Sequence, residues 1–220
     1  HCYRSSYLFF TSITNTIHEV SMELSELLAY DDVREECVIR SQFGFMAFHG
    51  GALEEVTDVI ASRAAERAGA SYYGIQLPDN LEWHIPSHRV TADQSPALAE
   101  FLNHVNIVVT VHGFGRAGYF TSLLLGGRNR RLASHLGERL RHHLPAYSIL
   151  DDIDLIPQNL RGMHQDNPVN VVKHAGVQLE LPPRVRGSSP LWWDWEGPGL
   201  TPHTESLIDA LVECATTWTH

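Results

Sequence analysis

The stretch that most constrains the fold is residues 44–54, where a short apolar segment leads into His49, two glycines and then Glu54. Because glycine tolerates backbone angles that other residues avoid, the turn after His49 can be tight. The helix-like pattern that follows predicts a buried strand, a turn and a helix. Imidazole and carboxylate groups are both zinc ligands, and Glu54 is close enough in sequence to fold back toward His49. We therefore expect this turn to hold a metal ion.

A second apolar stretch, residues 106–112, also ends on a histidine followed by glycine. Ligands of open α/β sheets bind outside the carboxyl ends of the strands, so adjacent strands would bring His49 and His112 to one edge. A third stretch, residues 177–181, carries Glu180 between two leucines. Two histidines and a carboxylate leave a tetrahedral zinc one open position for water, and a second carboxylate can act as general base. The sequence therefore predicts a zinc site.

The rest of the chain alternates strand-like and helix-like patterns. Further strands are expected over residues 35–42, 71–77 and 121–125, and helices over residues 54–68, 95–104, 129–144 and from residue 201 onward. Such alternation indicates an α/β fold, a single-domain three-layer sandwich whose mixed, largely parallel sheet carries helices on both faces. We expect one catalytic domain over residues 22–220. Residues 1–21 are expected to be an N-terminal extension, and whether it is native stays open.

Composition limits the partners and the compartment. The formal charge of −10 argues against a nucleic-acid partner. No apolar run approaches the roughly 18 residues that cross a bilayer, so no membrane association is expected. The three cysteines lie far apart, without the spacing of a disulfide framework or a cysteine zinc site. They fit a reducing compartment, and we expect a cytoplasmic protein.

Four segments carry a resemblance to a known family: residues 49–54, 109–113, 126–129, and 176–180 with the nearby Arg186. On these segments the chain resembles the poly-γ-glutamate hydrolases of phages and bacteria, which are similar in fold to zinc carboxypeptidases. The resemblance implies a zinc-dependent amidohydrolase that cleaves γ-glutamyl amide bonds of an anionic polymer. It also implies that zinc is held by His49, Glu54 and His112, and that Glu180 matches the catalytic glutamate.

Two arginines are the expected substrate-binding residues. Arg116 follows His112 closely and Arg186 follows Glu180, so both are expected near the metal. The planar fork of arginine binds a carboxylate at two points, which suits a glutamyl substrate.

Several alternatives stay open. Glu55 leaves the carboxylate ligand uncertain by one position, and His174 is a competing ligand because it directly precedes the Glu180 strand. A zinc deacylase or carboxypeptidase-type enzyme acting on small N-acyl amino acids is the first rival, favoured by a closed, short pocket. An open groove with several basic residues would favour a polymer instead. The second rival is a non-catalytic binding protein on the same fold.

Overall fold

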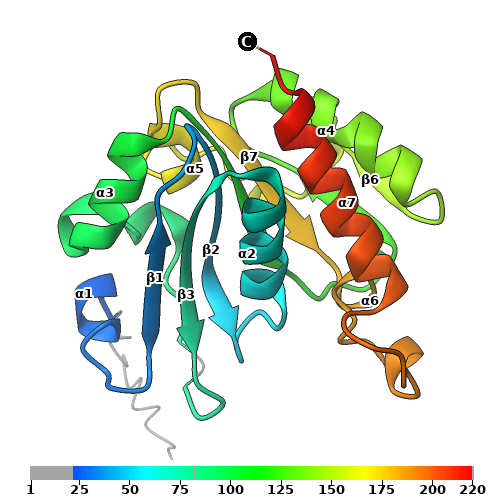
Figure 1. The fold of residues 1–220 in the computed structure, drawn as a ribbon, viewed down its shortest axis with the longest axis horizontal. Coiled ribbons are helices and arrows are strands. Elements are labelled where there is room, and N and C mark those ends of the chain that lie inside the picture. The colour runs from blue at the N-terminus through cyan, green and yellow to red at the C-terminus, as the bar shows by residue number, and fades with distance from the viewer. Residues whose placement is uncertain (1–21, 82, 220) are drawn as a thin grey trace, which may run out of the picture.

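The computed structural model describes residues 22–81 and 83–219, in which a seven-stranded sheet lies between two layers of helices (Figure 1). The strands are β1 (Arg34–Val38), β2 (Phe43–Gly51), β3 (Ser71–Leu77), β4 (Ile107–Gly113), β5 (Ser122–Leu125), β6 (Ser148–Leu150) and β7 (Gly176–Leu181). The α-helices are α1 (Leu24–Leu27), α2 (Thr57–Ala68), α3 (Pro96–His104), α4 (Arg130–His143), α5 (Pro168–Val171), α6 (Pro183–Arg186) and α7 (Pro202–Thr217). The predicted three-layer α/β sandwich is confirmed.

The central strands of the sheet run in one direction. The spatial order is β1-β3-β2-β4-β7-β5-β6. Strand β2 is parallel to β3 and β4, and β4 is parallel to β7. Strand β1 is antiparallel to β3, and β5 is antiparallel to β7. The sheet is therefore mixed but largely parallel, and the carboxyl ends of β2, β3, β4 and β7 meet at one edge.

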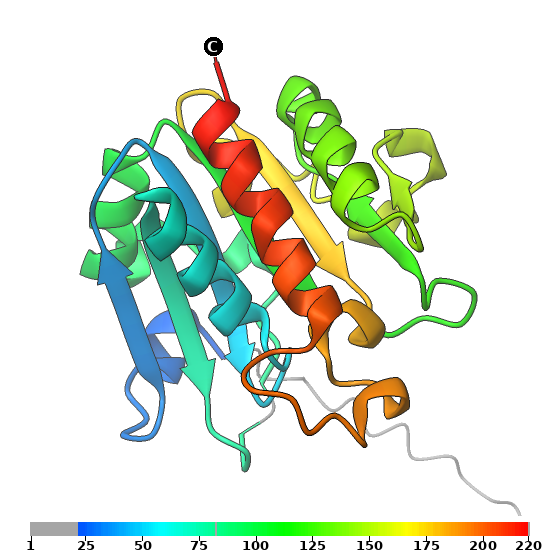
Figure 2. The ribbon, with the colours of Figure 1, turned by 45° about the vertical axis from the view of Figure 1, so that its right-hand side comes forward.

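The two faces of the sheet bury separate apolar clusters. Helices α2, α4 and α7 cover one face, where Phe45 and Val109 pack with Leu136 and Leu211 (Figure 2). Helices α1, α3 and α5 supply the apolar residues on the other face, where the alternate strand residue Met46 belongs to the cluster. Because both faces are covered, β2 and β4 are buried along almost their whole length, as expected for central parallel strands.

Local sequence sets where the long helices begin. The Ser95 hydroxyl accepts the backbone N–H of Leu98 at the start of α3 (3.1 Å), and the Asn129 side chain accepts that of Leu132 at the start of α4 (2.9 Å). Thr201 caps α7 in the same way. These caps satisfy donors that have no partner within the helix. The helix starts predicted near residues 95, 129 and 201 are confirmed.

Two predicted boundaries were wrong. The helix expected from Glu54 begins at Thr57, because Val56 has a φ of 72°, in the left-handed region, and residues 54–56 form a turn. The strand expected over residues 35–42 ends at Val38, and the N–H of Arg40 binds the Ser71 hydroxyl instead of a strand carbonyl (2.8 Å).

The sequence patterns also missed the short elements β6, α1, α5 and α6. The predicted extension over residues 1–21 lies outside the described residues. Within the described ranges, no helix combines the length and apolar character needed to cross a membrane.

Candidate functional site

The candidate site lies at the edge of the sheet where the parallel strands end. His49 is near the end of β2 and His112 near the end of β4. Glu180 lies on β7 directly beside His112, since these two residues are partners in the strand register. Residues paired in this way project their side chains from the same face of the sheet. The strand-end histidines and the strand glutamate thus come together as the topology predicted.

The turn after His49 brings Glu54 back over the end of β2. The N–H of Glu54 donates to the carbonyl of His49 (2.9 Å). Gly51 has a φ of 72°, and a Cβ there would lie 2.1 Å from the carbonyl oxygen of Leu77. Only glycine fits this close approach to β3 without strain. The pairing of β2 with β3 is also irregular between Ala47 and Gly50, around the position of His49.

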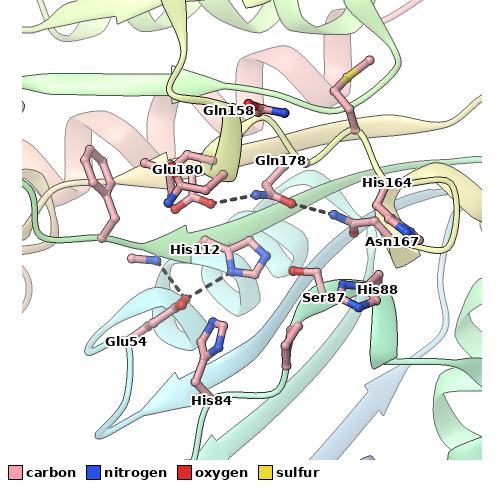
Figure 3. Close-up of a pocket in the computed structure, with 17 residues that line it drawn as sticks. Glu54, His84, Ser87, His88, His112, Gln158, His164, Asn167, Gln178 and Glu180 are labelled. Carbon is pink, nitrogen blue, oxygen red and sulfur yellow. Dashed lines mark hydrogen bonds and ion pairs between the residues drawn. The ribbon is translucent and has the colours of Figure 1, made fainter.

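Both oxygens of Glu54 meet an imidazole. Oε1 lies 2.9 Å from Nδ1 of His49, and Oε2 lies 3.3 Å from Nδ1 of His112. Oε2 also accepts the backbone N–H of Gly113 (2.8 Å). Figure 3 shows the two contacts of Oε2 at the floor of the cavity. The neighbouring Glu55 is exposed and contributes its backbone carbonyl to a contact with Arg186. Glu54, not Glu55, is therefore the carboxylate placed between the histidines.

The donor set fits a small divalent cation. Ligand atoms at the usual zinc distances of about 2.0–2.2 Å lie roughly 3.3 Å apart around a tetrahedron, close to the Nδ1–oxygen separations at Glu54. The Nε2–H of His49 donates to the carbonyl of Ile85 (2.8 Å), a contact that fixes the orientation of its ring and leaves Nδ1 facing Glu54. In the described part of the chain Nε2 of His112 is buried and has no hydrogen-bond partner. His49 and Glu54 thus present an imidazole nitrogen and a carboxylate oxygen at a spacing that suits a divalent cation.

His84 is a further candidate ligand that the sequence did not single out. Ligand atoms of His49, Glu54 and His84 all lie within 4.8 Å of one another. The ring of His84 lies 4.5 Å from that of His49, and its side chain faces the cavity in Figure 3. His84 is exposed on the loop after β3, whereas His112 is buried and contacts Glu54 directly. The two histidines are competing third ligands: His84 belongs to the group whose ligand atoms lie within 4.8 Å of one another, and His112 has the direct contact with Glu54.

Electrostatics at Glu54 favours the charged carboxylate. Burial acts to raise the pKa of Glu54, but the imidazoles of His49 and His112 outweigh it and hold the pKa below its ordinary value. Burial acts to lower the pKa of His112, but the Glu54 carboxylate outweighs it and raises that pKa. An ionised carboxylate between two imidazoles is the form that binds a metal ion.

Glu180 has a different environment. It is only 4% exposed, and burial raises its pKa to about 7, with Glu54 adding to the rise and His112 opposing it. Its Oε1 accepts a hydrogen bond from Nε2 of Gln178 (2.8 Å). A carboxyl group whose pKa lies near neutrality can both take up and release a proton, which is what general acid–base catalysis needs. Two carboxylates with opposite pKa shifts in one site indicate two separate roles.

The two expected substrate-binding arginines differ in position. Arg116 is exposed, and its Nη1 lies 3.5 Å from Oδ1 of Asn159, a residue that lines the cavity. Arg186 is buried, and it donates from Nη1 to the carbonyl of Glu55 (2.6 Å) and from Nε to that of Leu181 (3.2 Å). The structure thus places Arg116 at the rim and Arg186 behind the site, outside the residues that line the cavity.

The site opens into a cavity of about 370 Å³. Glu54, His112 and Glu180 line it together with side chains from the loops after β3 and β6, among them Ser87, His88 and His164. The rings of His88 and His164 lie 4.7 Å apart. Among the described residues that line the cavity, no lysine or arginine occurs. The cavity surface therefore combines carboxylates and imidazoles with apolar side chains such as Phe114, Leu160 and Met163.

Sequence reasoning missed the cavity residues that come from loops. His84 follows the carboxyl end of β3, and the strand-end rule that identified His49 and His112 could have identified it too. Gln178 could have been found from its place two residues before Glu180, on the same face of the strand. The alternative ligand His174 precedes β7 and so lies at the opposite edge of the sheet from His112. It is therefore not part of the site.

Comparisons with known proteins agree with this fold. The family described as poly-gamma-glutamate hydrolase has a model that matches residues 15–189. A solved bacteriophage poly-gamma-glutamate hydrolase is 20% identical with a TM-score of 0.68, covering 83% of this chain and 87% of that one. The zinc-free, apo structure of YndL is 18% identical with a TM-score of 0.72, covering 89% and 96%. The search of curated proteins gave no match. At these identities the solved structures show a shared fold.

Proposed function

The chain belongs to the poly-γ-glutamate hydrolase family, and from this premise we propose that it cleaves γ-glutamyl amide bonds of poly-γ-glutamate in a zinc-dependent reaction. Zinc would be held by His49, Glu54 and His112. The observation that carries the proposal is the convergence of the two Nδ1 atoms on opposite oxygens of Glu54, at 2.9 and 3.3 Å. Two proteins of similar structure, a bacteriophage poly-gamma-glutamate hydrolase and a zinc-free form of YndL, support it.

The chemistry divides between the metal and the protein. When bound, zinc would polarise the scissile carbonyl and lower the pKa of water, so that the water can lose a proton and attack near neutral pH. Glu180 takes a proton from the attacking water and passes it to the nitrogen of the leaving amine. Its raised pKa, about 7, suits both transfers. The buried position beside His112 keeps bulk water away from the carboxyl group.

The substrate carboxylate would meet Arg116 at the rim of the cavity. Arg116 is exposed and already lies near Asn159, so its guanidinium can turn toward a ligand without leaving a buried partner unpaired. Arg186 is the second candidate. Because its Nε and Nη1 are committed to backbone carbonyls, we propose that it contributes mainly positive charge behind Glu54 and Glu180.

A second candidate activity is the hydrolysis of small N-acyl amino acids. The observation that favours it is the lining of the cavity, which has a limited volume of about 370 Å³ and carries no lysine or arginine among the described residues. A polyanionic chain would bind more tightly in a groove lined by basic residues than in this cavity. The two activities share the same metal site and the same base, and differ in what lies beyond the scissile bond.

The test combines elemental analysis with two substrates. We expect about one zinc per chain in the purified protein, its loss from His49→Ala, and release of glutamate or short oligomers from poly-γ-glutamate. Turnover of N-acetyl-glutamate without turnover of the polymer would replace the proposed substrate by the small one. Protein that binds no zinc and cleaves neither compound would point to a non-catalytic binding protein on the same fold.

A further inference from the structure

A chain of side-chain amides runs from the start of α5 to Glu180. The backbone N–H of Val169 donates to Oδ1 of Asn167 (3.2 Å), and Nδ2 of Asn167 donates to Oε1 of Gln178 (2.7 Å). Nε2 of Gln178 then donates to Oε1 of Glu180 (2.8 Å). Figure 3 shows the last two hydrogen bonds end to end, from Asn167 through Gln178 to Glu180, above His112. All three side chains are at least 95% buried.

The direction of this chain is fixed by covalent structure. A backbone N–H can only donate, so Val169 requires the oxygen of the Asn167 amide to face it. The NH2 group of Asn167 then faces Gln178, whose amide must present its oxygen to Asn167 and its NH2 group to Glu180. Reversing either amide would set two acceptors or two donors against each other, which is costly in a buried site. Glu180 is therefore always met by a donor at Oε1.

Backbone packing holds the middle of the chain in place. Gly162 has a φ of 59°, and a Cβ there would lie 2.5 Å from Oε1 of Gln178. The loop that contains Gly162 thus packs directly against the Gln178 amide. Asn167 caps α5 at the end of the same loop. The position of Gln178 is consequently set from two sides, by its own strand and by this loop.

We propose that Asn167 and Gln178 are positioning residues. Their hydrogen bonds keep Oε1 of Glu180 occupied as an acceptor, so that Oε2 is the oxygen that carries the reacting proton. The inference rests on the proposed function, in which Glu180 is the general base. One O–H bond of the attacking water breaks as an O–H bond forms at Oε2. The water oxygen bonds to the carbonyl carbon, and the O–H bond at Oε2 then breaks as an N–H bond forms on the amine nitrogen and the C–N bond breaks. Oε2 accepts no hydrogen bond from the described residues, and Glu180 lines the cavity.

The test is Asn167→Asp, a change of nearly equal shape. One aspartate oxygen still accepts from Val169, but the other faces the oxygen of Gln178 and favours a reversed Gln178 amide. Gln178 then presents its oxygen to Glu180, and Oε1 loses its donor. We expect kcat on poly-γ-glutamate to fall by about 10- to 100-fold, with KM and zinc content nearly unchanged. A purely structural role of Asn167 would lower the melting temperature and leave kcat per folded molecule as it was.

The chain offers a matched control. Asn106 donates from Nδ2 to Oε1 of Gln42 (2.6 Å), an exposed amide pair at the start of β4 that leads to no carboxylate. Asn106→Asp should therefore leave kcat unchanged. If Asn167→Asp does not fold, Gln178→Met removes the same donor with an apolar side chain of similar length, and the same fall in kcat is expected.

A crystal structure of zinc-loaded Asn167→Asp separates this inference from the proposed function. We expect the Glu180 carboxylate to have moved away from Gln178. An unmoved carboxylate, or wild-type kcat in both variants, would overturn the positioning role even if the wild type cleaves poly-γ-glutamate. A wild type that cleaves no γ-glutamyl amide would overturn the proposed function, and the position of Glu180 in the variant would still decide whether the amide chain holds it.

Discussion

Replacing Glu180 by glutamine separates its chemical role from its structural one. The amide has nearly the same shape, and its oxygen can still accept from Nε2 of Gln178. It cannot accept a proton from water. General bases contribute roughly 10²- to 10⁴-fold, equivalent to about 3–5 kcal/mol of transition-state stabilisation. We therefore expect Glu180→Gln to retain the fold and the zinc and to lose turnover by about that factor.

The same substitution should stabilise the metal-free protein, with a defined pH dependence. Burial raises the pKa of Glu180 from 4.5 to about 7. A carboxyl group with a raised folded-state pKa supports folding below pH 4.5, and that support is lost as the pH rises to 7. Above pH 7 the loss amounts to roughly 3 kcal/mol. Glutamine carries no charge, so it avoids the loss.

Thermal unfolding of chelator-treated protein measures this effect. For a domain of this size 1 kcal/mol corresponds to about 2–4 °C, so Tm of Glu180→Gln should exceed that of the wild type by roughly 6–12 °C at pH 8. The difference should vanish near pH 4. Equal Tm values at pH 8 would refute the claim that burial destabilises the ionised form of Glu180. A stable, zinc-loaded variant with wild-type turnover would refute the role of Glu180 as general base.

Three further outcomes test the ligands and the substrate arginine. His112→Ala should abolish zinc binding by elemental analysis while His84→Ala retains it, and the opposite result would make His84 the third ligand. Glu54→Gln should weaken zinc affinity in chelator competition by more than the roughly 10- to 100-fold typical of an outer-shell partner, and Glu55→Gln should change it little; the reverse order would move the ligand by one position. Arg116→Ala should raise KM for poly-γ-glutamate about tenfold or more with kcat nearly constant, and an unchanged KM would remove Arg116 from substrate binding.

The central strands could be predicted because their signal is local. Strands β2 and β4 are buried on both faces, and their largely apolar sequences lead into His49 and His112. Strand β7 is also buried, but its apolar residues alternate with Gln178 and Glu180. The rule that ligands bind at the carboxyl ends of parallel strands then placed these side chains at one edge. Their meeting in space depends on the strand order, in which β4 lies between β2 and β7, and the sequence analysis did not predict that order.

The remaining parts depend on contacts distant in sequence. Strand β6 has three residues and pairs only with β5, so no periodic pattern marks it. The turn at Glu54 depends on the left-handed backbone of Val56, a conformation that a β-branched residue rarely adopts and that apolar spacing does not encode. His84 and Asn167 lie on loops, and their distance from the site is set by how the loops pack against the sheet. These features required the structure.

Charge balance connects the metal with the substrate. The described lining of the cavity holds the carboxylates of Glu54 and Glu180 and no lysine or arginine, and the whole chain carries a formal charge of −10. An anionic glutamyl substrate entering this cavity would meet net repulsion if the imidazoles were neutral. A divalent cation held by His49, Glu54 and His112, as proposed, would supply two positive charges at the point where the substrate carbonyl binds. Arg116 adds a third at the rim. Under the proposed function the cation would serve the binding of the substrate as well as the chemistry, so its removal should raise KM and lower kcat.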